Sequence, residues 1–331
     1  MAVNHSVGSS RTNKKQYKRP KVVSLFSGAG GLDLGFTEEG YSIIWANDID
    51  QNAVETYREN LGSHIHLGDV STMDVSQIPD CDVLIGGFPC QGFSHANIHR
   101  SKDDERNQLY KQYLRVLAAK RPRAFVAENV KGILTMEGGD AIKRIVSDFK
   151  VAGYNVEYRL LNAANYGVPQ KRERVFIVGI RKDIDATFVF PKPTCDKNGS
   201  NGLPTWTSVR DAICNIPDPD GPQANTVPNN TYSKYKLVMN GYLGKRPIDP
   251  DGPAPTVTAR GDRKGGVVVL PNPLSNRRMT VRELATIQDF PINYHFCGTQ
   301  TDCYRQIGNA VPVGLARAIA SSLLKTLRSN A

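Results

Sequence analysis

The sequence contains neither a long apolar run nor an apolar leader. No stretch of its 331 residues approaches the roughly 18 consecutive apolar residues that a membrane-spanning helix needs. The N-terminus also lacks the apolar core of a secretory signal peptide. We therefore expect a cytoplasmic protein with no membrane partner. Its length is sufficient for two domains, or for one large domain with an insertion.

Paired cysteines are also missing. The six cysteines include no Cys-x-x-Cys pair, and no histidine lies at a ligand spacing near them. This pattern indicates neither a disulfide framework nor a zinc site, so we expect separate thiols and no metal. The six are Cys81, Cys90, Cys195, Cys214, Cys297 and Cys303.

Acidic residues are absent from the first 21 positions, which hold six lysines or arginines. The whole chain has a net charge of +10 and a pI of about 9.3, which predicts a polyanionic partner. We interpret residues 1–20 as a flexible basic tail. Such a tail either aids solubility or contacts a nucleic-acid backbone.

From residue 22 onward, short apolar runs alternate with amphipathic stretches. This rhythm predicts an α/β fold, a Rossmann-like, doubly wound and mostly parallel sheet with helices on both faces. We expect strands at residues 22–26, 42–47, 64–67, 82–87, 124–129 and 174–180. We expect helices at residues 32–39, 51–60, 106–120 and 139–152.

The alternation stops near Pro191. Residues 191–273 are rich in proline, glycine, asparagine and aspartate and have no helical period of useful length. We interpret them as a small irregular domain of β structure and loops, inserted into a main domain of residues 21–190 and 274–331. A helix returns at residues 280–290, where Thr280 and Glu283 can form a capping box. A last helix starts at Pro312.

A glycine-rich turn, LFSGAGGLDLG at residues 25–35, follows the first predicted strand. Gly28 and Gly30 allow the backbone to turn tightly and to approach a ligand at the start of the next helix. The dinucleotide fingerprint Gly-x-Gly-x-x-Gly requires glycine at position 33, where this chain has Asp33. A turn without a ligand is the simpler interpretation, but the substitution favours a nucleoside cofactor smaller than a dinucleotide.

Acidic side chains follow the ends of the next two predicted strands. Asp48 lies where a carboxylate can accept hydrogen bonds from ribose hydroxyls. Asp69 can accept one from an adenine amino group, with Ile49 and Val70 packing against the ring. Each acid alone is equally typical of a solvated strand end. Because open α/β sheets bind ligands at the carboxyl ends of their strands, the two acids and Gly28 together predict a nucleoside pocket.

Cys90 lies on the loop IGGFPCQGFS after the fourth predicted strand. Neither packing nor strand pairing requires a thiol there, so it is either an incidental free cysteine or a reactive one. Glu128 follows the apolar part of the fifth predicted strand, where a carboxylate is costly unless it is paired or protonated. The edge with the nucleoside pocket therefore also carries a candidate nucleophile and a candidate acid.

Arg172 and Arg174 lie in the basic segment GVPQKRERVFIV, residues 167–178. Side chains alternate along an extended chain, so these two share one face. Such a segment is often only a basic turn before a strand. Two arginines on one face can also hold a phosphate or a base oxygen.

Together these motifs resemble those of the DNA (cytosine-5)-methyltransferase family of class I S-adenosylmethionine-dependent enzymes. The resemblance rests on LFSGAGG, GFPCQGFS, ENV, QKRER, TVRELATIQDFP and YRQIGNAVPV, which occur in the family's order. It covers residues 21–190 and 275–328. Ser27 and Asn107 depart mildly from the family pattern, and neither puts activity in doubt.

The resemblance implies that S-adenosyl-L-methionine is the methyl donor, that S-adenosyl-L-homocysteine is the product, and that no metal takes part. Phe26 would stack near the adenine, Pro89 would border the methyl group, and Asn309 would help to close the pocket. The implied cofactor-binding residues are Phe26, Gly28, Gly30, Gly31, Leu32, Asp48, Ile49, Asp69, Val70, Pro89, Asn309 and Val311.

The resemblance also implies covalent catalysis on a cytosine flipped out of duplex DNA. Cys90 would attack carbon 6, and Glu128 would bind ring N3 and the 4-amino group. Arg174 would contact O2, and Arg172 would fix that strand or the backbone. Residues 191–273 would be the target recognition domain. The implied DNA-binding residues are Gln91, Ser94, Thr256, Arg260, Arg263 and Lys264, with Arg277 and Arg278 as further phosphate partners.

Three other functions are weighed against this one. One branch of the family methylates transfer RNA, but the GFPCQ form and the sizeable insertion favour DNA. Intact Cys90, Glu128 and Arg174 argue against an inactive DNA-binding member, and Asp33 argues against a nicotinamide oxidoreductase. We expect a monomeric, prokaryotic, nucleoid-associated enzyme of a restriction-modification system, whose endonuclease acts separately.

Overall fold

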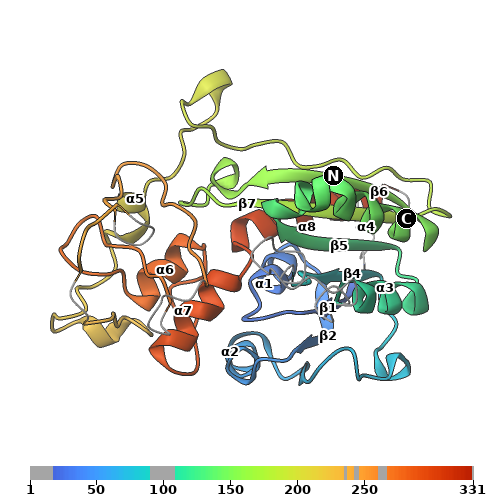
Figure 1. The fold of residues 1–331 in the computed structure, drawn as a ribbon, viewed down its shortest axis with the longest axis horizontal. Coiled ribbons are helices and arrows are strands. Elements are labelled where there is room, and N and C mark those ends of the chain that lie inside the picture. The colour runs from blue at the N-terminus through green and yellow to red at the C-terminus, as the bar shows by residue number, and fades with distance from the viewer. Residues whose placement is uncertain (1–17, 90–108, 235–236, 242–245, 260–266, 330–331) are drawn as a thin grey trace, which may run out of the picture.

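Seven strands form one mixed sheet in the order β3-β2-β1-β4-β5-β7-β6 (Figure 1). The computed structural model describes residues 18–89, 109–234, 237–241, 246–259 and 267–329. β7 runs antiparallel to both of its neighbours, and the other pairings are parallel. This confirms the predicted Rossmann-like, mostly parallel sheet. The strands are β1 Lys21–Leu25, β2 Ser42–Asp48, β3 Ile65–Leu67, β4 Val83–Gly86, β5 Ala124–Val130, β6 Tyr154–Asn162 and β7 Glu173–Arg181.

β6 has no counterpart among the predicted strands. It forms one edge of the sheet, and several of its residues are exposed, including Glu157 and Arg159. An edge strand that is partly exposed carries polar residues in place of the continuous apolar run of a central parallel strand. The apolar signal that marks the other strands is therefore missing here.

Helices cover both faces of the sheet, as predicted. Alternate strand residues point to opposite faces, with Val22 and Ile85 in the core beneath α1 and α8 and Val23 and Leu84 in the core beneath α3 and α4. The two cores make the sheet doubly wound. The helices of this domain are α1 Gly31–Glu38, α2 Gln51–Leu61, α3 Leu109–Lys120, α4 Asp140–Val151 and α8 Val313–Arg328.

α8 is a core helix. The stretch Gln300–Arg328 is long and apolar enough to cross a membrane by length and composition, but 72% of its most apolar window is buried inside the protein. Gly35 of α1 packs directly against it, since a Cβ at Gly35 would lie 2.6 Å from the Cβ of Ala316. Glycine is therefore required for the close approach of the two helices.

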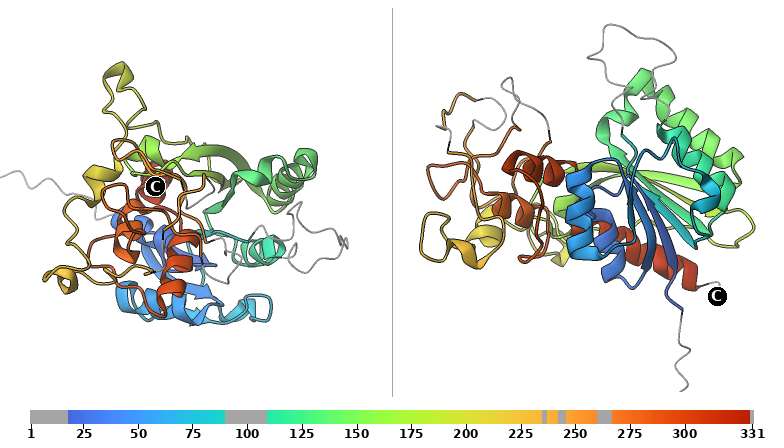
Figure 2. Two further views of the ribbon diagram at one scale, coloured as in Figure 1. Left: turned by 60° about the vertical axis from the view of Figure 1, so that its left-hand side comes forward. Right: turned by 90° about the horizontal axis from the view of Figure 1, so that it is seen from below.

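A second lobe lies beside the sheet domain (Figures 1 and 2). It contains the short helix α5 Val209–Ile213 of the insertion, together with α6 Val281–Ile287 and α7 Gln300–Asn309. One hydrophobic core joins Val209 and Val269 of the insertion to Leu284 of α6 and Ile307 of α7. The lobe's core therefore continues past residue 273, where we place the end of the recognition domain, and that boundary stays a prediction.

The insertion contacts the sheet domain twice at one short segment before β7. At its start, the Tyr166 hydroxyl donates to the Pro191 carbonyl at 3.0 Å. Farther along the insertion, the Ala254 N–H donates to the Pro169 carbonyl at 2.9 Å. Pro191 and Ala254 are therefore both fixed to the segment Tyr166–Pro169.

Capping boxes start both larger helices of the second lobe. At α6, Thr280 Oγ1 accepts from the Glu283 N–H at 3.0 Å and Glu283 Oε2 accepts from the Thr280 N–H at 2.8 Å, which confirms the predicted cap. Thr299 and Asp302 make the same arrangement at α7. α7 is absent from the predicted helices, although its Thr-x-x-Asp pattern carries the signal.

Asp33 is a fully buried acid in the first turn of α1. Its Oδ1 accepts from the Ser24 hydroxyl at 2.7 Å, and its Oδ2 accepts from the Tyr57 hydroxyl at 2.8 Å. Burial raises the pKa of Asp33 to about 6, against the opposing effect of these hydrogen bonds. The residue that breaks the dinucleotide fingerprint thus links β1, α1 and α2 from inside the protein.

Replacing Asp33 by Asn tests this buried ionisation. Because the pKa is raised from 3.8 to about 6 on folding, the folded chain holds the proton more tightly, and wild-type stability falls as the pH rises through this range. Asn does not titrate, so the unfolding free energy of Asp33→Asn relative to wild type should rise by about 2 to 3 kcal/mol from about pH 4 to pH 8. Urea unfolding followed by tryptophan fluorescence measures this, and a pH-independent difference would contradict it.

Candidate active site

The carboxyl ends of β1, β2, β4 and β5 lie side by side at one edge of the sheet. Leu25 of β1 pairs with Asn47 of β2 and with Gly86 of β4, and Gly86 pairs with Ala127 of β5. The strand order reverses at β1, which is the position where open α/β sheets bind ligands. The next residues along this edge are Phe26, Asp48, Gly87 and Glu128.

Asp48 closes the glycine-rich turn after β1. Its Oδ2 accepts from the Gly28 N–H at 2.7 Å, and its Oδ1 accepts from the Asp50 N–H at 2.9 Å. Burial raises the pKa of Asp48, while these hydrogen bonds favour the ionised form. Gly28 has a φ of 54°, and a Cβ added there would meet nothing within 4 Å. A half-buried carboxylate therefore lies next to an open stretch of backbone.

The residues that follow β2 and β3 differ in exposure. Ile49, directly after Asp48, has 69% of its surface exposed, whereas Val70 is buried in the core. Asp69 is half-buried, and its Oδ1 accepts from the Ser71 N–H at 2.8 Å, which fixes the turn after β3. An exposed isoleucine beside a carboxylate is a surface that a flat ring can cover.

The other glycines of the turn serve packing. A Cβ at Gly30 would lie 2.4 Å from Leu61 Cδ1, and one at Gly31 would lie 2.4 Å from the Val311 carbonyl oxygen. Leu32 is buried with them in the core. These residues hold the turn in place from behind, and only Gly28 borders open space.

Glu128 is a buried carboxylate at the end of β5, and it is paired with Arg174 of β7. Arg174 Nε donates to Glu128 Oε1 at 2.8 Å, and only 12% and 11% of the two side chains are exposed. Burial raises the pKa of Glu128, and the charges of Arg174 and Arg172 oppose that rise. A Cβ at Gly87 would lie 2.8 Å from Glu128 Oε2. Glycine in the GGFPC loop therefore leaves room for the carboxylate against the loop backbone.

The loop that leads to Cys90 is anchored to β5. Asn129 Nδ2 donates to the Phe88 carbonyl at 3.0 Å, and the Phe88 side chain is buried. Pro89 is exposed and is the last described residue before position 90. We assign no role to Asn129 from sequence, yet its side chain fixes the loop just before Cys90. The only sequence feature that points to a role for Asn129 is its place in the ENV motif.

Arg172 is completely buried, whereas Arg174, which shares its face of the extended chain, is only partly buried. Its guanidinium donates to three backbone carbonyls, those of Val257, Gly308 (2.8 Å) and Ala310 (2.9 Å). Burial and the charge of Arg174 lower the pKa of Arg172. These contacts hold the part of the insertion around Val257 against the end of α7, where Asn309 is exposed.

Gln170 makes a second connection that the sequence does not reveal. Its Nε2 donates to Gln288 Oε1 at 2.8 Å, and its Oε1 accepts from the Val257 N–H at 2.8 Å. Beside it, the Thr256 hydroxyl donates to the Lys171 carbonyl at 2.8 Å. Thr256 therefore lies next to the QKRER segment. Neither hydrophobic periodicity nor charge distinguishes a buried glutamine in a sequence. Only its place as the first residue of the QKRER motif points to Gln170.

The remaining predicted DNA contacts are distributed unevenly. Arg277 Nη2 is paired with Glu283 Oε1 at 2.7 Å, so its charge is engaged inside the second lobe. Arg278 is half-buried. The predicted residues that lie outside the described residues are Cys90, Gln91, Ser94, Arg260, Arg263 and Lys264.

Comparison with known proteins matches this architecture to one family. The model of C-5 cytosine-specific DNA methylases matches residues 20–325. The chain is 39% identical to the type II methyltransferase M.NgoFVII of Neisseria gonorrhoeae, over 94% of this chain and 88% of the relative. It is 38% identical to the type II methyltransferase M.BspRI of Lysinibacillus sphaericus, over 93% of this chain and 82% of the relative.

Solved structures share the fold. A protein from an Escherichia coli prophage, described as a DNA modification methyltransferase, superposes with a TM-score of 0.71 at 26% identity, covering 93% of this chain and 99% of that one. The family model spans both the sheet domain and the second lobe. The chain therefore belongs to the C-5 cytosine-specific DNA methylase family and is a DNA (cytosine-5)-methyltransferase.

Proposed function

We propose that this enzyme methylates carbon 5 of a cytosine flipped out of a specific duplex DNA sequence, through a covalent bond between Cys90 and carbon 6. One observation carries the proposal. The buried pair of Glu128 and Arg174 lies against Gly87 of the loop that leads to Cys90, on the sheet edge that also holds Asp48.

The residues after β1, β2 and β3 fit S-adenosyl-L-methionine. Open space beside Gly28, a half-buried carboxylate at Asp48 and an exposed apolar side chain at Ile49 suit a backbone contact, a ribose and an adenine, respectively. When bound, this molecule supplies the methyl group that carbon 5 takes up. The proposed contacts are Phe26, Gly28, Asp48, Ile49, Asp69, Val70, Pro89, Asn309 and Val311, with Gly30, Gly31 and Leu32 supporting the turn.

Cys90 makes carbon 5 reactive. Addition of its thiolate to carbon 6 opens the 5,6 double bond and moves that electron pair toward carbon 5, so one difficult step becomes two easier ones. After carbon 5 has gained the methyl group, loss of the carbon 5 proton restores the double bond and expels the thiolate. The cysteine is regenerated in each turnover.

Glu128 and Arg174 balance the charge that develops on the ring. A carboxyl group whose pKa burial has raised can hold a proton at ring N3, while it also accepts from the 4-amino group. A proton at N3 offsets the negative charge that thiolate addition brings. Arg174 binds O2 of the base and holds Glu128 in place. Arg172 is a positioning residue that acts through the backbone it binds.

The target base has to leave the duplex, because its carbon 6 and N3 are not accessible to these groups within the helix. Flipping costs on the order of a few kcal/mol, which protein contacts to DNA offset. We assign target recognition to residues 191–273 and backbone or base contacts to Thr256, Gln91, Ser94, Arg260, Arg263 and Lys264. The relatives are type II methyltransferases, which supports a role in a restriction-modification system. We further propose that the enzyme is monomeric, cytoplasmic and nucleoid-associated, that its endonuclease acts separately, and that no metal takes part in catalysis.

Covalent trapping tests the proposed chemistry. Duplex DNA in which cytosine is replaced by 5-fluorocytosine cannot lose the carbon 5 substituent as a proton, so with S-adenosyl-L-methionine it should give a complex stable to denaturation. Cys90→Ala should give none, and Cys81→Ala, which changes a half-buried cysteine outside the proposed site and the recognition domain, should trap like wild type. A complex with Cys90→Ala would overturn the nucleophile, and trapping of fluorinated transfer RNA in place of duplex DNA would overturn the substrate.

Glu128→Gln keeps the shape of the side chain but removes its ability to exchange a proton. The single-turnover rate of methylation, measured with tritiated methyl donor, should fall roughly a hundredfold or more. Glu173→Gln is the matched control, since Glu173 is exposed on the same strand as Arg174 and pairs with Lys131. An unchanged rate in Glu128→Gln would rule out the proposed acid-base role.

Asp48→Asn tests whether the Asp48 carboxylate binds the ribose of S-adenosyl-L-methionine. Loss of a charged acceptor for the ribose hydroxyls should weaken binding of S-adenosyl-L-methionine by about tenfold to a hundredfold, which calorimetric titration can measure. Asp50→Asn is the control because Asn also caps helices, and Asp50 caps α2 through its side chain. Equal affinities of wild type and Asp48→Asn for S-adenosyl-L-methionine would show that Asp48 does not contact the cofactor.

A further inference from the structure

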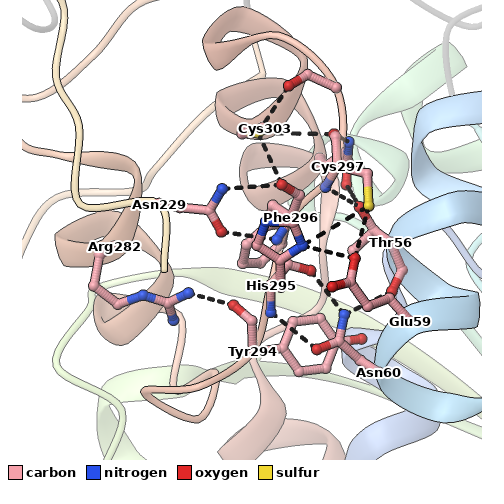
Figure 3. A network of polar contacts seen from close by, with 12 residues as sticks. Thr56, Glu59, Asn60, Asn229, Arg282, Tyr294, His295, Phe296, Cys297 and Cys303 are labelled. Atoms are coloured by element: carbon pink, nitrogen blue, oxygen red, sulfur yellow. Dashed lines mark hydrogen bonds and ion pairs between the residues drawn. The ribbon is translucent and has the colours of Figure 1, made fainter. Parts of the chain in front are cut away.

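Glu59, His295 and Cys297 bring three metal-binding side chains together where α2 meets the second lobe (Figure 3). The distance from His295 Nδ1 to Glu59 Oε2 is 2.7 Å, and that from Cys297 Sγ to the same oxygen is 3.1 Å. Cys297 Sγ lies 4.0 Å from His295 Nδ1. The Glu59 side chain is 50% exposed and that of His295 is 42% exposed, so the group is accessible from solvent.

The backbone that carries His295 is held in place by α2. Asn60 Nδ2 donates to the His295 carbonyl at 2.7 Å, and Asn60 Oδ1 accepts from the His295 N–H at 2.9 Å. The Cys297 N–H donates to Thr56 Oγ1 at 2.8 Å. Phe296, between the two ligand residues, is buried in the core of the second lobe. The backbone hydrogen bonds of His295 and Cys297, together with the buried Phe296, therefore hold the His295 and Cys297 side chains toward Glu59.

The three ligand types select the class of metal. Thiolate, imidazole and carboxylate together are typical of zinc sites, whereas magnesium and calcium prefer oxygen ligands alone. Tetrahedral zinc with ordinary bond lengths needs its N, O and S ligand atoms about 3.3 to 3.6 Å apart. The present separations of 2.7, 3.1 and 4.0 Å require side-chain shifts of only about half an ångström on this criterion.

We propose that Glu59 Oε2, His295 Nδ1 and Cys297 Sγ form a zinc-binding site, with solvent water as the fourth ligand. Binding displaces the Cys297 thiol proton, which now lies in the S–H hydrogen bond to Glu59, and releases it to solvent.

The site is remote from the proposed methyl-transfer centre. Glu59 lies near the end of α2, eight residues after its first residue Gln51, so at about 1.5 Å per residue it is about 12 Å along the helix from the strand edge that holds Asp48. The ion would therefore take no part in methyl transfer, and it would join α2 of the sheet domain to the second lobe. The same lobe contacts the glycine-rich turn, since the Tyr294 hydroxyl donates to the Ala29 carbonyl.

Cobalt(II) replaces zinc in such sites and reports its ligands by absorption. Titration of the full-length protein with Co²⁺ should give, at one equivalent, a thiolate-to-cobalt charge-transfer band and the visible bands of tetrahedral cobalt, and Zn²⁺ should abolish both. Cys297→Ser should lose the charge-transfer band, and Glu59→Gln should weaken cobalt binding at least about tenfold. Cys214→Ser, an exposed cysteine away from the cluster, should behave as wild type.

Thermal unfolding gives a second readout that is independent of methylation. Zn²⁺ at a concentration well above its dissociation constant should raise the unfolding temperature of wild type and Cys214→Ser, but not that of Cys297→Ser or Glu59→Gln. Equal cobalt spectra in wild type and Cys297→Ser would overturn the site. So would an equal zinc-induced temperature shift in Glu59→Gln, because the contacts would then be ordinary surface hydrogen bonds.

Discussion

The buried guanidinium of Arg172 holds together the parts of the chain on which the active site depends. A charge without exposure to water is costly unless its N–H groups have acceptors, and here three main-chain carbonyls accept from Nη1 and Nη2, while the buried Nε has no hydrogen-bond partner. Those carbonyls belong to Val257 of the insertion and to the end of α7. Gly308 makes the junction tight, since a Cβ there would lie 2.3 Å from the backbone of Thr258. Arg174, two residues along β7, takes its position from this junction.

Three acids near the sheet edge, two of them buried and Asp48 half-buried, have three kinds of partner, and this difference separates their roles. Asp33 is held by two hydroxyls, Asp48 by backbone N–H groups and Glu128 by a guanidinium. Hydrogen bonds from backbone N–H groups and a nearby guanidinium stabilise the ionised form of a carboxyl group, whereas burial destabilises that form in all three acids. Only Glu128 combines burial with a nearby charge beside the loop that carries the predicted nucleophile.

The positions of most strands, the cap of α6 and the convergence of strand ends follow from local patterns, and so they can be predicted from the sequence. Apolar runs mark β1 to β5, and the acids after them are close in space because parallel strands end at one edge. β6 and α7 are not predicted, the first because it is a partly exposed edge strand. Gln170 and the cluster around Glu59 depend on distant partners, and Glu59 is 236 residues from His295. No spacing rule joins residues so far apart.

Pro191 and Ala254 of the insertion are both fixed to the short segment before β7. An inserted segment that is anchored in this way can gain, lose or exchange residues without moving the chain on either side of it. Changes in the loops between Pro191 and Ala254 therefore need not move Glu128 or Arg174. Such an architecture separates the evolution of sequence preference from the evolution of chemistry, because one can diversify while the other stays under constant selection.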